Sequence, residues 1–114
     1  MSDCIFCRII EGEIPSDTVY ENESVKVFKD INPVAPVHLI IVPKVHIESL
    51  EDLNDENKAA AADCLNVVKV VAEMSGVSES GYRLISNYGE DGGQTLNHLH
   101  FHLIGGIKMR EGLI

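Results

Sequence analysis

The hydrophobic residues in the first part of the chain fall into short runs separated by polar residues. Two β-prone runs, 18–20 and 25–28, flank the polar stretch 21–24, and this pattern predicts a hairpin connection. The run 37–42 is almost continuously apolar and is followed by Pro43, which is typical of a central strand covered on both faces. This part of the chain therefore predicts neighbouring strands of one sheet.

The segment 55–75 predicts the main helix, because apolar residues recur in it at spacings of three and four. Asp55 and Glu56 favour a helix start, and Gly76 follows the last periodic residue as a stop. The apolar residues of this helical stripe are Ala61, Cys64, Leu65, Val68, Val71 and Ala72.

A second β region follows the helix. Residues 81–86 predict a strand, 87–95 form a loop rich in glycine, and 98–104 predict the last strand. No repeat, low-complexity run or linker divides the sequence. We therefore expect a single α+β domain over residues 1–114.

Charge and hydropathy exclude two classes of partner. The chain has 18 acidic and 9 basic side chains among 114 residues, a formal net charge of −9, and its basic residues are scattered, whereas nucleic-acid surfaces cluster them. No stretch approaches the roughly 20 apolar residues of a membrane helix, and the first residues do not resemble a secretion signal. We expect no nucleic-acid or membrane partner and a cytoplasmic location.

Three histidines alternate with apolar residues over 98–104, which is His-Leu-His-Phe-His-Leu-Ile. In a strand, His98, His100 and His102 share one face, with neighbours about 6.5–7 Å apart. A single histidine beside apolar residues is a hydrogen-bonded core side chain about as often as it is a functional one. Three in strict alternation, however, predict a functional row. Imidazole binds metals and acts as a nucleophile or proton donor, so a catalytic metal and metal-free nucleophilic catalysis both fit.

The loop before this row favours phosphate chemistry. Gly92, Gly93, Gln94 and Thr95 offer close backbone approach, N–H groups and a hydroxyl for a phosphate oxygen. Glycine pairs alone are mostly ordinary turns. Beside the three histidines, however, the combination indicates a substrate with a phosphoryl or nucleotidyl group.

Cys4 and Cys7 form a Cys-x-x-Cys pair near the amino terminus, which suits a redox motif, half of a zinc site or chance. A redox role is the weaker hypothesis, because a thioredoxin-like pair follows a strand in a βαβ frame. His46 and His98 would complete a Cys₂His₂ set for zinc. Cys64 lies on the helical stripe and is expected to be a buried packing residue.

Residues 98–104 resemble the His-x-His-x-His signature of the histidine triad (HIT) family, and the similarity extends over nearly the whole chain. The further blocks resemble the Hint branch, the purine nucleoside phosphoramidases. These blocks are 4–10 with 13–15, 30–33 with 35–38, 41–44, and 91–94. The resemblance implies an antiparallel sheet of about five strands with one main helix and a short amino-terminal helix. It also implies a homodimer in which two such sheets join.

The same resemblance implies a hydrolase that cleaves the P–N bond of purine nucleoside 5′-monophosphoramidates. His100 would attack the α-phosphorus and expel the amine, and water would then hydrolyse the nucleotidyl-histidine to AMP or GMP. His102 would contact the phosphate and handle the proton, and His38 would orient the nucleophile through a relay. Thr95 stands where relatives often carry serine and retains a hydroxyl. No catalytic metal is required.

The resemblance also places the purine nucleotide. Asp30 would accept hydrogen bonds from the ribose hydroxyls, although an aspartate before Ile-Asn-Pro also suits a turn carboxylate. Apolar residues would surround the base, and each of them taken singly is as often a core residue. The remaining nucleotide contacts by this resemblance are Phe6, Ile9, Ile14, Phe28 and Ile31 at the base, and Asn87, Gly93 and Gln94 along the sugar-phosphate path.

For the cysteine pair, the resemblance divides the family. Many Hint-type relatives lack the pair, whereas others and the related galactose-phosphate uridylyltransferases hold a structural zinc with such a pair and two histidines. This chain is similar to the second group. The resemblance therefore implies a structural zinc on Cys4, Cys7, His46 and His98.

The carboxyl-terminal tail departs from the family pattern. After Gly106 it lacks the aromatic and proline-rich end of some relatives, so the leaving group stays open. Two other functions remain as alternatives: a dinucleoside polyphosphate hydrolase, and a nucleotide-binding or interaction module whose catalysis is vestigial.

Overall fold

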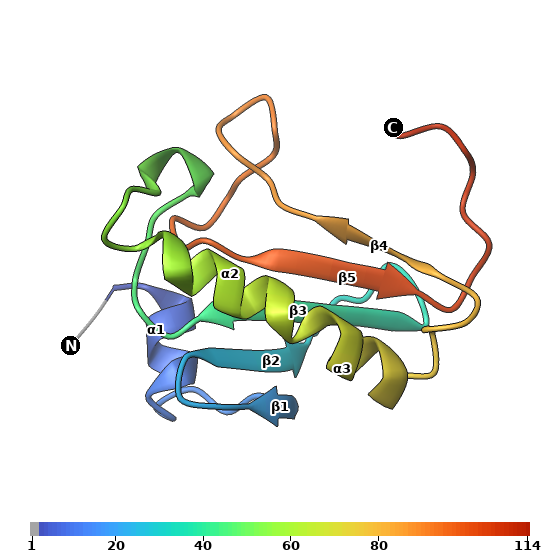
Figure 1. The fold of residues 1–114 in the computed structure, drawn as a ribbon, viewed down its shortest axis with the longest axis horizontal. Coiled ribbons are helices and arrows are strands. Elements are labelled where there is room, and N and C mark those ends of the chain that lie inside the picture. Colours follow the sequence, from blue (N-terminus) through green and yellow to red (C-terminus); the bar gives the residue numbers. More distant parts are fainter. Residues whose placement is uncertain (1–2) are drawn as a thin grey trace.

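The structure, a computed structural model, describes residues 3–114 and contains one antiparallel five-stranded sheet with helices packed on it (Figure 1). The strands have the spatial order β1-β2-β3-β5-β4, and each neighbouring pair is antiparallel. The α+β class, the five-stranded sheet and the short amino-terminal helix are confirmed. The elements are α1 (Ile5–Ile10), β1 (Thr18–Glu21), β2 (Val25–Lys29), β3 (Val37–Pro43), α2 (Lys58–Asn66), α3 (Val68–Met74), β4 (Tyr82–Ile85) and β5 (Phe101–Gly105).

Both faces of β3 are covered, as its apolar sequence predicts. Leu39 and Ile41 belong to the main core, which lies between the sheet and the pair α2 and α3. Ile40 and Val42 belong to a smaller core under α1. Because side chains alternate along a strand, this division places α1 on the face of the sheet opposite α2 and α3.

The predicted hairpin is also present. The side chain of Asn22 accepts hydrogen bonds from the amides of Ser24 and Val25, each at 2.8 Å, in the turn between β1 and β2. Such a bond from an asparagine side chain to the backbone ahead of it is the reason asparagine is favoured in turns. The hairpin leads the chain into β2 beside the central strand.

The helical segment is shorter than predicted and is divided at Val67. Helix α2 begins at Lys58 rather than at Asp55. In the turn before it, the Asn54 side chain accepts hydrogen bonds from the amides of Glu56 and Asn57 at 2.8 and 3.0 Å. At Val67 the amide bonds the carbonyl three residues back, at 3.3 Å, which tightens the helix locally.

The division changes which residues of the stripe are buried. Leu65 was predicted on the buried face, but it is 52% exposed, whereas Val67 is buried. Cys64 is buried as predicted, and burial raises the pKa of its thiol to about 12. The three helices have 6, 9 and 7 residues, and none within residues 3–114 is long and apolar enough to cross a membrane.

The last strand begins at Phe101 rather than at His98. The carbonyl oxygens of His98 and His100 accept hydrogen bonds from side chains, namely the ring of His100 at 2.7 Å and the hydroxyl of Ser86 at 3.1 Å. The alternation of faces nevertheless holds, because Leu99, Phe101 and Leu103 all lie in the main core. The histidine row is therefore an extended segment that leads into β5.

A buried lysine fastens α1 to the sheet. Lys26 of β2 is only 8% exposed, and its ammonium group donates to the carbonyl oxygen of Ile9 at the end of α1, at 3.2 Å. A cation at the carboxyl end of a helix is favourable, because unpaired carbonyl groups gather there. Glu21 lies 4.0 Å from the same ammonium group. This contact fixes the helix that carries Cys7 and Phe6.

Strand β4 forms one edge of the sheet. An edge strand presents unpaired backbone groups that can pair with a second sheet. The homodimer with a joined sheet stays a prediction. Of the two edge strands, β4 lies nearer the histidine row, and two sheets would join through β4.

The main core gives a test of the fold. Ile41 is fully buried and Ile107 is 54% exposed, so the same truncation at the two positions compares a core site with a surface site. Ile41→Ala should lower the free energy of unfolding by about 2–5 kcal/mol, and Ile107→Ala by less than about 0.5 kcal/mol. Chemical denaturation measures both, and equal losses would contradict the core described here.

Candidate functional site

A cavity of about 590 Å³ lies between α1, the ends of β2 and β3 and the segment before β5. Its apolar end is formed mainly by α1 and Phe28, and its polar end by histidines and the loop 87–95. The structure brings to it every nucleotide-binding and catalytic residue predicted from the sequence except Gln94. Those residues are Phe6, Ile9, Ile14, Phe28, Asp30, Ile31, His38, Asn87, Gly93, Thr95, His100 and His102.

The sequence did not single out several other lining residues. Ile40 follows His38 by two positions in β3, so strand alternation alone could have placed it on the same face. No local pattern distinguishes the rest. The further residues are Ile5, Pro15, Ser16, Lys29, Asn32, Val34, Ile40 and Leu96.

Gln94 holds the glycine-rich loop in place rather than lining the cavity. Its side-chain amide donates to the carbonyl oxygens of Glu48 and Leu96, at 2.9 and 3.1 Å, and accepts from the Gly89 amide at 3.2 Å. A Cβ atom at Gly92 would collide with the carbonyl oxygen of Tyr88, so the close backbone approach expected at this glycine occurs within the loop itself.

His100 has a ring orientation set by the backbone. Its Nδ1 lies 2.7 Å from the carbonyl oxygen of His98, and because a carbonyl only accepts, Nδ1 carries the proton. In a neutral imidazole the other nitrogen, Nε2, then has a free lone pair. The ring of Phe6 packs edge-on against His100 with centroids 5.0 Å apart. The ring of His100 is thereby held in a nearly buried position with the lone pair of its Nε2 free.

His38 and His102 form a hydrogen-bonded pair beside His100. The His38 Nδ1 accepts from the backbone amide of Val34 at 3.1 Å, so its proton lies on Nε2. That Nε2 is 2.9 Å from the Nδ1 of His102. His102 is then an acceptor at Nδ1 and keeps its own proton on Nε2. The relay from His38 to His100 stays a prediction, and the hydrogen bond of His38 here goes to His102.

Burial keeps His102 neutral. Desolvation lowers the pKa of His102 below its usual 6.5, and the neighbouring histidines His100 and His38 lower it further, while Asp30 opposes them. A neutral ring at His102 agrees with the acceptor role of its Nδ1.

Asp30 has both of its carboxylate oxygens in use. One oxygen accepts from the Asn32 amide at 2.8 Å, which is the turn role that the sequence left open. The other lies 3.3 Å from the Nε2 of His38. The same side chain lines the cavity, so it is also placed to face a ligand there.

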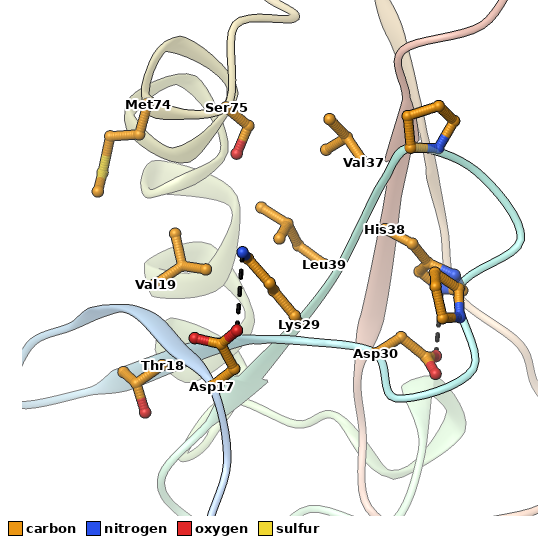
Figure 2. A pocket seen from close by; sticks show the side chains of 12 residues that line it. Asp17, Thr18, Val19, Lys29, Asp30, Val37, His38, Leu39, Met74 and Ser75 are labelled. Carbon is orange, nitrogen blue, oxygen red and sulfur yellow. Dashed lines mark ion pairs between the residues drawn. The ribbon is translucent and has the colours of Figure 1, made fainter.

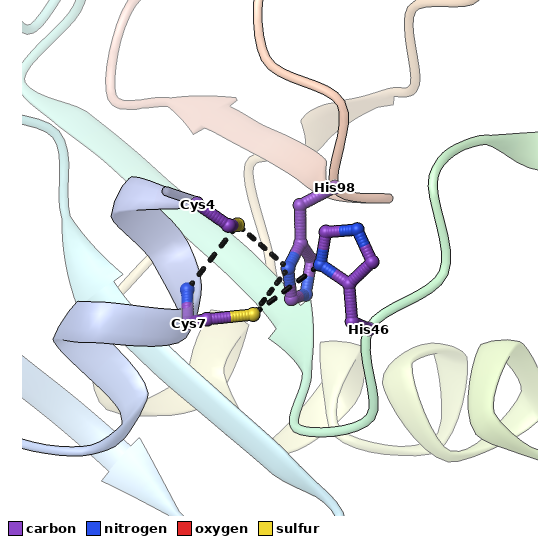
Figure 3. Close-up of side chains that lie close together, drawn as sticks. All are labelled: Cys4, Cys7, His46 and His98. Carbon is purple, nitrogen blue, oxygen red and sulfur yellow. Dashed lines mark hydrogen bonds between the residues drawn. The ribbon is translucent and has the colours of Figure 1, made fainter. Parts of the chain in front are cut away.

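The four predicted metal ligands converge on one point (Figure 3). The sulfur atoms of Cys4 and Cys7 lie 3.3 and 3.6 Å from the Nδ1 of His98, and the Cys7 sulfur lies 3.3 Å from the Nδ1 of His46. All four possible ligand atoms are within 4.8 Å of one another. Helix α1 supplies Cys7 and its N-cap, Cys4, while His46 and His98 come from the segments after β3 and before β5.

The donor set of this cluster fits a metal. The Nε2 of His98 lies 2.9 Å from the carbonyl oxygen of Pro43, so Nε2 carries the proton and Nδ1 turns its lone pair toward the sulfur atoms. Metal-bound histidines commonly donate their other ring N–H to a carbonyl in this way. Burial lowers the pKa of His98, which favours the neutral form that binds metals.

Asp30, His38 and His102 form a second group whose possible ligand atoms lie within 4.8 Å of one another, but its hydrogen bonds do not suit a metal. To bind through Nε2, a neutral His38 would have to carry its proton on Nδ1. The Nδ1 atom, however, already accepts a hydrogen bond from the Val34 amide. The three side chains are therefore held together by hydrogen bonds through the Nε2 of His38.

A second cavity, of about 490 Å³, lies beside the first on the side of α3 (Figure 2). Lys29 points across it to Asp17, with the ammonium nitrogen 3.6 Å from a carboxylate oxygen. Of the predicted site residues, Asp30 and His38 line it. Of the three alternating histidines, His100 and His102 line the first cavity, and none of the three lines the second.

Comparisons with known proteins agree with this geometry. The chain is 43% identical over 104 residues to the purine nucleoside phosphoramidase of Escherichia coli K12. This match covers 91% of this chain and 87% of the relative. It is 43% identical over 105 residues to the protein HitA of Neisseria gonorrhoeae, which covers 92% of this chain and 97% of the relative.

Solved structures give the same result. A HIT family hydrolase from Clostridium thermocellum superposes with a TM-score of 0.96 at 46% identity, covering 100% of this chain and 99% of the other. A HIT family hydrolase from Legionella pneumophila superposes with a TM-score of 0.91 at 44% identity, covering 96% and 97%. The family model described as HIT domain matches residues 11–109. The chain belongs to the HIT domain family.

Proposed function

We propose that the protein is a hydrolase that cleaves the P–N bond of purine nucleoside 5′-monophosphoramidates through a covalent nucleotidyl-histidine. The observation that carries this proposal is the free Nε2 lone pair of His100 at a cavity with one apolar and one polar end. The Escherichia coli relative bears the name of this activity. The family and the site chemistry therefore support the same reaction.

In the first step, the Nε2 of His100 attacks the α-phosphorus. A bond forms between this nitrogen and phosphorus, the P–N bond breaks, and the departing amine takes a proton supplied by solvent, which leaves His100 as a positively charged nucleotidyl-imidazolium. The Nε2–H of His102 and the hydroxyl of Thr95, both at the cavity, are the donors available to the phosphate oxygens and the leaving group. Positive charge that develops on His100 is stabilised by the His98 carbonyl oxygen at its Nδ1.

In the second step, water attacks the same phosphorus, the bond between phosphorus and the Nε2 of His100 breaks, and the attacking water loses a proton to solvent, which balances the proton taken up by the amine. The nucleoside monophosphate and free His100 result. Two displacements through a covalent intermediate replace one difficult step by two easier ones. The role of His38 is to hold His102 as an acceptor at Nδ1 and hence as a donor at Nε2.

The apolar end of the cavity is assigned to the purine. Phe6 and Phe28 have centroids 5.8 Å apart and meet edge to face, and Ile9 and Ile14 complete an aliphatic wall. Aromatic and aliphatic side chains of this kind suit a flat apolar base. Asp30 and Asn87 lie toward the polar groups and are assigned to the ribose, with Gly93 beside the phosphate.

We further propose that Cys4, Cys7, His46 and His98 hold a structural zinc ion. A closed set of four protein ligands is typical of structural zinc and leaves no open coordination position for a substrate. When bound, the ion ties α1 to the segments after β3 and before β5. No step of the proposed reaction uses it.

The nucleophile can be tested by mass spectrometry of protein quenched in acid after mixing with an adenosine phosphoramidate. Wild type should carry a nucleotidyl group mapped to His100 and should release AMP. His100→Ala should form no adduct, and its kcat should fall by at least about 10³-fold, because the attacking group is removed. Ile107→Ala, changed outside the cavity, should behave as wild type.

Each other outcome of this experiment has a distinct meaning. AMP release that survives in His100→Ala would refute the double displacement. Nucleotide binding without adduct or AMP would favour a binding module, and faster cleavage of a dinucleoside polyphosphate than of the phosphoramidate would favour the P–O–P bond as the natural target.

The neutral state of His102 predicts a pH dependence of stability. Burial and the adjacent histidines lower the pKa of His102 below 6.5, so near this pH the unfolded chain binds a proton that the folded protein rejects. Stability from this group is full above about 6.5 and is lost as pH falls toward the lowered value. The free energy of unfolding can be measured with denaturant at pH 7.5 and again at a pH below 6.5. Its decrease between the two should be smaller in His102→Gln than in wild type, and an equal decrease in both would contradict a lowered pKa.

The zinc proposal has an independent test in elemental analysis of protein purified without a metal-affinity tag. We expect about one zinc per chain. Cys4→Ser should lower the zinc content and the melting temperature, because a closed site contributes folding free energy. Cys64→Ala removes a thiol from the core instead and should keep its zinc, and less than about 0.2 zinc per chain in wild type would refute the site.

A further inference from the structure

The loop between β2 and β3 presents a backbone amide to the catalytic cluster. Val34 turns its side chain outward, where it is 68% exposed. Its amide nevertheless points inward and donates to the Nδ1 of His38 at 3.1 Å. His38 is only 7% exposed, so its Nδ1 is shielded from solvent and has this amide as its hydrogen-bond partner.

The amide leaves one choice for the proton of a neutral His38. Because an amide only donates, the Nδ1 of His38 must accept, and the proton must lie on Nε2. Two acceptors face that atom, the Nδ1 of His102 at 2.9 Å and a carboxylate oxygen of Asp30 at 3.3 Å. Both neighbours are therefore consistent with the proton position that the amide imposes.

The opposite tautomer would be unfavourable on both sides of the ring. A proton on Nδ1 would face the N–H of Val34, and the lone pair on Nε2 would face the carboxylate of Asp30, which can only accept while it is ionised. A buried polar group without a suitable partner is costly.

We propose that the backbone amide of Val34 is a positioning group that fixes His38 as a hydrogen-bond donor and thereby makes His102 a donor toward the substrate phosphate. The chain of contacts runs from the Val34 N–H to His38, from the His38 Nε2–H to the Nδ1 of His102, and from His102 into the cavity through its remaining N–H. The group that His102 meets on the substrate must then be an acceptor, such as a phosphoryl oxygen. The catalytic consequence rests on the function proposed above, whereas the tautomer does not.

The test removes the N–H and little else. Val34→α-hydroxyisovalerate, introduced by suppression of a stop codon, replaces the amide nitrogen by an ester oxygen and keeps the side chain. The matched control is Ala35→lactate, because the amide of Ala35 makes no hydrogen bond within residues 3–114. Nitrogen-15 NMR of the imidazole rings then reports which nitrogen of His38 is protonated, and steady-state kinetics with an adenosine phosphoramidate report the catalytic effect.

In wild type and the Ala35 ester, His38 should carry its proton on Nε2. In the Val34 ester, the Nδ1-protonated tautomer of His38 should appear, and kcat should fall about fivefold to tenfold with KM within twofold. A tenfold fall corresponds to about 1.4 kcal/mol, which is near the net contribution of one hydrogen bond.

Three results would overturn the proposal. One is a wild-type His38 protonated on Nδ1. Another is an unchanged His38 tautomer in the Val34 ester. The third is a loss of activity in that ester with the tautomer retained, which would assign a merely structural role to the amide. Absence of phosphoramidate hydrolysis by wild type would refute the proposed function instead, and the NMR result would still decide the tautomer.

Discussion

The hydrogen bond between the ring of His100 and the carbonyl oxygen of His98 is the contact on which the site depends. The Nδ1 of His100 and this oxygen lie 2.7 Å apart, which fixes the proton on Nδ1 and leaves a free lone pair on Nε2. The side chain of the same His98 donates to the Pro43 carbonyl oxygen and faces Cys4 and Cys7. A single residue therefore joins the proposed metal site, through its side chain, to the proposed nucleophile, through its backbone.

Much of the fold follows from short-range patterns. The continuous apolar run that became β3 and the polar turn at Asn22 could be predicted because alternation and turn chemistry act over a few residues. The exposure of Leu65 could not, since it depends on a tightened turn at Val67. The late start of β5 also escaped prediction, because the hydroxyl of Ser86 takes a carbonyl that a strand would have used.

For the site, the residue types could be predicted and their hydrogen-bond partners could not. Histidines in alternation and a cysteine pair are visible in the sequence, and the family resemblance placed most cavity residues. The proton positions depend on the amide of Val34 and the carbonyl of Pro43, which any residue type supplies at the backbone. Gln94 illustrates the same limit, since its amide bonds Glu48 from a distant segment rather than a ligand.

Phe6 connects parts of the molecule that would otherwise be separate. Its ring lies 5.8 Å from that of His98, 5.0 Å from that of His100 and 5.8 Å from that of Phe28, measured between centroids. One side chain thus lines the cavity, packs against the proposed nucleophile and neighbours the proposed metal site. The site is therefore not modular, and an engineer who reshapes the slot at Phe6 to accept a different base would have to redesign the two histidines with it.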